Sequence, residues 1–78
     1  MFYLEDDKGT PVDIGDVLYR ETTDDSGEVI DWWYCMLIMD SSSYQLRLDL
    51  VRGTHWSSKD EMLSRYVKND RLISWTKV

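Results

Sequence analysis

The sequence of residues 44–50, YQLRLDL, alternates apolar and polar side chains without interruption. Successive side chains of a β-strand point to opposite faces of a sheet, so this period of two predicts a strand with one buried and one solvated face. The expected buried face holds Tyr44, Leu46, Leu48 and Leu50, and the expected solvated face holds Gln45, Arg47 and Asp49. The fold should therefore contain a sheet with one dry side.

A longer and more apolar segment, VIDWWYCMLIM at residues 29–39, precedes this strand across a polar turn. Its β-branched and aromatic residues fall on both faces, which predicts a central strand. Trp32 and Trp33 are adjacent and must point to opposite sides. Because Asp31 lies on the same side as Trp33, we expect Trp32 to be buried and Trp33 to be exposed. Burial of both rings in a fully covered strand is the alternative.

Three shorter strands are expected, at residues 2–5, 17–22 and 71–77, and turns rich in Asp and Gly separate several of these segments. No internal repeat, low-complexity tract or linker interrupts residues 1–78, so a single domain is expected. Hydrophobic residues make up 42% of the chain, which is enough for a small core without a metal or a disulfide.

Near the C-terminus the apolar period becomes helical. Ser58 and Glu61 fit a capping box, and an apolar stripe follows on a helix expected over residues 59–68, formed by Met62, Leu63, Tyr66 and Val67. The order β-β-β-β-α-β with short connections favours a mainly β (α+β) fold, either a small antiparallel SH3-like β-barrel or a meander, with one short C-terminal helix. A flat sheet with the helix on one face is the alternative.

Charge is distributed unevenly along the chain. Residues 1–40 contain eleven acidic and two basic side chains, a net charge of −9, whereas residues 41–78 contain four acidic and seven basic ones, a net charge of +3. Such a surface repels nucleic acid and membranes on one side and attracts basic protein surfaces there. The single cysteine, Cys35, excludes an internal disulfide, and the N-terminus lacks the basic and long apolar regions of a signal peptide. A soluble cytoplasmic protein is expected.

Residues 6–18, DDKGTPVDIGDVL, contain the phrase D-x-x-G-x-x-[apolar]-x-x-G-D-[apolar]. This phrase resembles the opening of small phage and prophage proteins of the YopX type, where it begins a β-rich domain. The resemblance implies an origin in a mobile genetic element and carries no established activity with it.

The residue types of several chemistries are present without the patterns that those chemistries need. His55 is close in sequence to Ser57, Ser58 and Asp60, but the members of a catalytic triad usually come from separate elements, so a loop leading into a helix cap is the preferred interpretation. The acidic residues 24–28 lack the alternating ligands of a calcium loop, and no zinc-ligand or phosphate-loop spacing occurs. We therefore expect no catalytic residue, no metal and no cofactor.

The expected function is that of a small acidic protein-binding domain, a monomer or small homo-oligomer. It could be a phage-encoded inhibitor of the anti-CRISPR or anti-restriction type that competes with nucleic acid for a basic groove on a host protein. The expected partner-binding residues are Asp24, Asp25, Glu28, Asp31 and Trp33. The alternative is a nucleic-acid-binding SH3-like barrel that uses the interleaved basic and aromatic residues Arg52, His55, Trp56 and Lys59.

Overall fold

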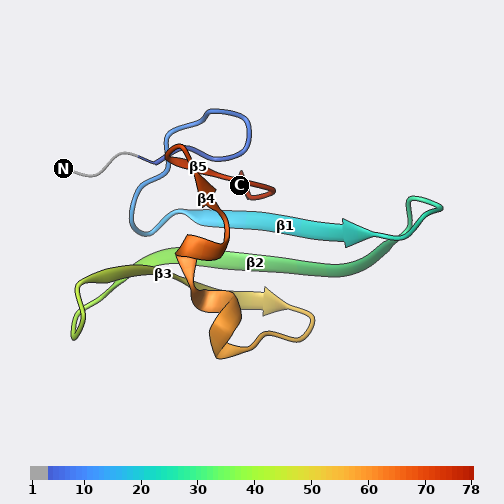
Figure 1. Cartoon of the computed structure of the whole chain (residues 1–78). Helices are drawn as coiled ribbons and strands as arrows, with labels where there is room; N and C mark the ends of the chain where they lie inside the picture. The colour runs from blue at the N-terminus through green and yellow to red at the C-terminus, as the bar shows by residue number, and fades with distance from the viewer. Residues whose placement is uncertain (1–3) are drawn as a thin grey trace.

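The chain forms a four-stranded antiparallel sheet in a computed structural model, which describes residues 4–78 (Figure 1). The strand order is β3-β2-β1-β6, and consecutive strands β1, β2 and β3 form a meander. The strands are β1 (Val17–Thr23), β2 (Val29–Asp40), β3 (Gln45–Gly53) and β6 (Thr76–Lys77). The prediction of a mainly β, antiparallel protein is confirmed.

The sheet is open, so the expected closed barrel is wrong. Strands β3 and β6 are its two edges and do not pair with each other. Strand β6 is only two residues long and pairs with β1 at Leu18 and Tyr19 alone. At the other edge, β3 meets the C-terminal segment through a single bridge between Arg47 and Met62. The two residues of β6 are too few to pair along β3 and close the sheet.

The alternating strand β3 is present, with one change at its start. Leu48 lies opposite Leu37, and both side chains are completely buried, while Gln45 and Asp49 are exposed as predicted. Tyr44 does not join the buried face: it is 82% exposed and has a φ of 55° in the turn before β3. Tyr44 belongs to the turn and not to the strand, because the N–H of Tyr44 donates to the carbonyl of Asp40 at 2.7 Å.

The expected helix over residues 59–68 is replaced by two short 3-10 helices, η1 (Ser58–Glu61) and η2 (Leu63–Arg65). Met62 between them is extended, because its backbone pairs with Arg47 at the edge of β3. The capping box also lies one residue earlier than predicted. Ser57, not Ser58, is the cap, and its N–H donates to the Asp60 carboxylate at 2.8 Å.

The remaining C-terminal strands are short. Strand β4 (Val67–Lys68) pairs with β5 (Arg71–Leu72) in a separate two-stranded sheet. The expected strand over residues 71–77 is divided into β5 and β6, because Ser74 adopts a φ of 71° and turns the chain. The expected strand over residues 2–5 lies partly outside the described residues, and Glu5 forms only isolated bridges.

One face of the sheet carries the core. Figure 1 shows the C-terminal segment, drawn in orange, crossing in front of β2 and β3. Its Trp75 is completely buried, and the rings of Trp56 and Tyr66 pack edge-on against it at 6.2 and 5.5 Å. Gly53 lets the end of β3 approach β2 closely, because a Cβ atom there would lie 2.5 Å from the carbonyl oxygen of Trp32.

Candidate functional site

The far half of the β1–β2 hairpin projects from the sheet as an arm, which we define as residues 21–31 and call the acidic arm. Strand β6 covers the edge of β1 only as far as Tyr19, and β3 ends at Gly53, opposite Trp33. Figure 1 shows the hairpin extending past both ends, and the molecule measures 41 × 25 × 19 Å as a result. The acidic arm therefore has two open backbone edges and two accessible faces.

The acidic arm contains five carboxylates and no lysine or arginine. The side chains of Asp25 and Glu28 are exposed and form no ion pair within residues 4–78. Asp24 has a structural role, since its Oδ1 accepts hydrogen bonds from the Ser26 hydroxyl at 2.6 Å and from the Glu28 N–H at 3.0 Å. These two donors hold the pKa of Asp24 below its ordinary value, so this carboxylate stays ionised to a lower pH than an ordinary aspartate.

An aromatic strip runs along the sheet face that the core leaves uncovered; we define it as Tyr19, Trp32 and Tyr34. The rings of Tyr19 and Tyr34 lie 4.7 Å apart, and Trp32 meets Tyr34 edge-on at 5.9 Å. The guanidinium of Arg52 lies over Trp32, 5.7 Å from its ring centroid. All three rings are partly exposed and belong to neither the core nor the residues packed against it. The strip adjoins the base of the acidic arm.

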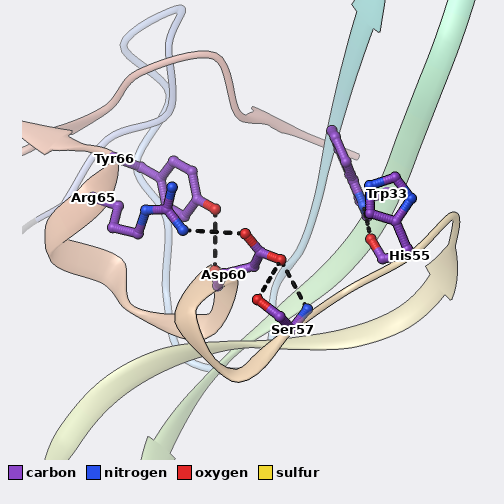
Figure 2. Close-up of polar contacts among 6 residues, drawn as sticks. All are labelled: Trp33, His55, Ser57, Asp60, Arg65 and Tyr66. Carbon is purple, nitrogen blue, oxygen red and sulfur yellow. Dashed lines mark hydrogen bonds and ion pairs between the residues drawn. The ribbon is translucent and has the colours of Figure 1, made fainter.

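The two tryptophans of β2 have the orientation opposite to the one predicted. Trp33 is only 7% exposed and belongs to the core, where its Nε1–H donates to the carbonyl of His55 at 2.9 Å (Figure 2). The prediction that Trp33 is exposed rested on Asp31, which lies on the same side of the strand. Asp31 lies on the projecting arm, beyond the segment that covers Trp33, so the two can share a side of β2 while only Trp33 is buried.

The four residues of the expected nucleic-acid platform do not meet on one surface. Trp56 turns inward and packs on Trp33 at 6.3 Å, whereas Arg52 lies over Trp32 on the opposite face of the sheet. His55 has an exposed ring whose Nδ1 lies 3.8 Å from Asp31. Lys59 is exposed and forms no ion pair within the described residues. The structure thus joins Arg52 to the aromatic strip rather than to Trp56.

Asp60, not His55, is the centre of the polar contacts near η1 (Figure 2). Its Oδ2 accepts from the N–H and the hydroxyl of Ser57, and its Oδ1 lies 3.2 Å from Nη1 of Arg65. The Ser57 N–H is the largest influence on the pKa of Asp60, which lies below its ordinary value. No hydrogen bond joins His55 to a serine among the described residues, so the triad residue types are not arranged as a triad.

The remaining reactive side chain is Cys35, which is completely buried in the core. Burial raises the pKa of its thiol to about 12, so the thiolate that would act as a nucleophile does not form at neutral pH. Within residues 4–78, no group of three or more His, Cys, Asp or Glu side chains is placed to hold a metal ion. The same residues contain no helix long and apolar enough to cross a bilayer.

Sequence reasoning missed Tyr19 and Tyr34. The signal for Tyr34 was its position two residues after Trp32, which places both on one face of β2. Tyr19 shares that face because it lies opposite Tyr34 in the β1–β2 register.

Comparison of the chain with protein-family models, curated proteins and solved structures gives no match. The resemblance of residues 6–18 to YopX-type proteins therefore stays a prediction.

Proposed function

We propose that this protein is a non-catalytic binding domain that docks on a basic surface of another protein through its acidic arm, with Trp32 as the aromatic anchor. The observation that carries the proposal is the geometry of the arm. Five carboxylates lie on a projecting hairpin without a basic neighbour inside it, next to three partly exposed rings.

The charge and the rings have different roles in this proposal. Summed negative charge speeds the encounter with a basic surface, and its effect falls as salt screens it. Exposed tryptophan and tyrosine then supply buried area at low entropic cost, which slows dissociation. The arm and the strip adjoin at Glu21 and Trp32, which are paired neighbours in the register, so one partner surface can contact both.

The class of partner follows from the charge. A groove that normally binds nucleic acid is lined with lysine and arginine, and an arm with five carboxylates is complementary to it. We therefore propose competition with nucleic acid for such a groove, as an anti-CRISPR or anti-restriction inhibitor encoded by a phage would require.

One observation favours direct nucleic-acid binding as the second candidate. Arg52 lies over the Trp32 ring, and a stacked arginine beside partly exposed rings is an arrangement that binds unpaired bases. The neighbouring carboxylates oppose it. Glu21 lies opposite Trp32 in the register, and it and the rest of the acidic arm would repel phosphates approaching the strip.

The experiment that separates these functions is affinity capture from a bacterial lysate at low and at moderate salt. Wild type is compared with a variant carrying Asp25→Lys and Glu28→Lys, which leaves the Asp24 turn intact. Recovery of a nucleic-acid-handling protein by the wild type, and its loss with the variant, supports the proposal. Recovery of nucleic acid in place of a protein would contradict it and favour the second candidate.

A further inference from the structure

A small pocket opens on the core side of β1, where the C-terminal segment does not fully cover Arg20. Its volume is about 260 Å³. It is separate from the aromatic strip, which lies on the other face of the sheet, because Arg20 lies opposite Trp33 in the register. The pocket is lined by Arg20, Asp60, Arg65, Tyr66, Ile73 and Ser74.

Arg20 is a cation without an anionic partner. Its guanidinium carbon lies 5.2 Å from the ring centroid of Trp33 and 5.4 Å from that of Tyr66, so two rings hold the group. The Nε atom is buried and has no hydrogen-bond partner, and Arg20 forms no ion pair within residues 4–78. A guanidinium fixed in this way presents its donors as a rigid fork.

The other charged groups of the pocket are already engaged. Asp60 pairs with Arg65 at 3.2 Å through Oδ1, and its Oδ2 accepts two hydrogen bonds from Ser57. Arg65 and Asp60 compensate each other, which leaves the positive charge of Arg20 in excess. The Tyr66 hydroxyl donates to the Asp60 carbonyl at 3.1 Å.

Ile73 and Ser74 in the pocket wall indicate what the rest of the ligand contacts. Ile73 is 46% exposed and offers contact to a short aliphatic chain. The Ser74 side chain forms no hydrogen bond within the described residues, and its backbone is held at a φ of 71°, a conformation that costs energy for a residue with a Cβ atom.

We propose that this pocket binds a carboxylate carried on a short aliphatic chain, with Arg20 as its bidentate partner. A carboxylate is planar and matches the guanidinium fork, and its single negative charge equals the excess charge of the pocket. A phosphate dianion would exceed that charge and would face the Asp60 carboxylate.

The test is an NMR titration of the wild-type protein with sodium butyrate, in which the arginine Nε–H signals are followed at constant ionic strength. The expected result is a saturable shift of the Arg20 signal. Arg52 is the matched control, because it also lies over a tryptophan ring but outside the pocket. An unchanged Arg20 signal, an equal shift of both arginines, or tighter binding of methyl phosphate would overturn the proposal.

Two substitutions of Arg20 test whether its guanidinium binds the carboxylate. Arg20→Gln should weaken butyrate binding about tenfold or more, as expected when a hydrogen-bonded charged partner is removed. Arg20→Lys keeps the charge but loses the planar fork and should also bind more weakly. Full affinity in a folded Arg20→Gln protein would contradict the proposal, and the wild-type titration tests it even if that variant does not fold.

The source of the carboxylate is distinguished by comparing butyrate with a short peptide that has blocked ends and one glutamate. Equal binding would support an acidic side chain of a partner protein, and binding of butyrate alone would support a free carboxylic acid. If neither butyrate nor the peptide shifts the Arg20 signal, the proposed site is wrong. These outcomes are independent of the proposed function, because no residue of the acidic arm or the aromatic strip lines the pocket.

Discussion

The backbone N–H of Lys77 donates a 2.9 Å hydrogen bond to Oδ2 of Asp6, a residue 71 positions away. The other oxygen of Asp6 accepts from the N–H groups of Lys8 and Thr10, each at 2.9 Å. Asp6 is only 1% exposed, so one buried carboxylate joins the N-terminal loop to the last strand. Lys77 is also held by its side chain, because its Nζ forms an ion pair with Oδ2 of Asp16 at 3.2 Å.

Asp6→Asn is expected to destabilise the fold by about 1.5 to 3 kcal/mol, the usual value for hydrogen bonds to a charged group. An amide cannot satisfy all three donors, because its NH₂ group must face at least one of the N–H groups that the carboxylate accepts. Chemical denaturation measures the change. Asp25→Asn on the exposed turn is the control, and equal stability of the two variants would contradict the account of Asp6.

The pH dependence of stability follows from the same contact. Burial by itself would raise the pKa of Asp6, but the N–H groups of Lys77, Thr10 and Lys8 outweigh it and hold the pKa below its ordinary value of 3.8. A lowered pKa in the folded state means that the stabilisation is present above pH 3.8 and is lost as pH falls through the folded value. The difference in unfolding free energy between wild type and Asp6→Asn should therefore shrink below about pH 4. A constant difference down to pH 2 would oppose this.

Strand β3 offers a test of which of its residues form the core. Leu48→Ala should cost about 2 to 5 kcal/mol, because the side chain is completely buried opposite Leu37. Tyr44→Ala should cost less than about 0.5 kcal/mol, since that ring lies exposed in the turn. Thermal or urea unfolding of the two variants measures both values. Similar losses would contradict the position of Tyr44 outside the buried face.

The cap of η1 gives a second pair of contrasting variants. Ser58→Ala should leave the unfolding midpoint unchanged, whereas Asp60→Ala should cost about 1 kcal/mol, because the Asp60 carboxylate accepts from both donors of Ser57. Equilibrium denaturation checks both. A larger loss for Ser58→Ala would place the cap where the sequence pattern first suggested it.

Local patterns predicted the strands well where the periodicity was strong. Leu48 in β3 lies on the buried face that its alternation requires, and the apolar run of β2 forms the expected central strand between β1 and β3. Tyr44 continued that alternation in sequence, but turn geometry took it out of the strand. The helical stripe failed for a tertiary reason, since pairing of Met62 with the edge of β3 interrupted it.

The candidate site was predictable in part. The cluster of acids at residues 24–28 was visible, and the turn that presents it formed as expected. The face of Trp33 was not visible, because it depends on how far the C-terminal segment covers β2, and Asp31 lies beyond that limit. Arg20 was missed because only the fold brings it between Trp33 and Tyr66.

The two adjacent tryptophans should have different effects on folding and on binding. Trp33→Ala removes a buried ring and should cost about 3 to 5 kcal/mol of stability. Trp32→Ala should leave the protein folded and instead speed dissociation from its partner, by an amount on the order of thirtyfold for an anchor worth about 2 kcal/mol. Denaturation and surface plasmon resonance measure the two effects. A stable Trp33→Ala protein that loses binding would reverse the assignment.

The central claim is that the acidic arm is the surface that meets a basic partner. Its most direct test is the association rate with the captured partner, measured from low to physiological salt for wild type and for the variant with Asp25→Lys and Glu28→Lys. A control with Asp13→Lys and Asp49→Lys makes the same change in net charge outside the arm. We predict association roughly tenfold slower at low salt, with a flatter salt dependence, for the arm variant and a much smaller change for the control. Equal rates and salt dependence for the arm variant and wild type would contradict the claim.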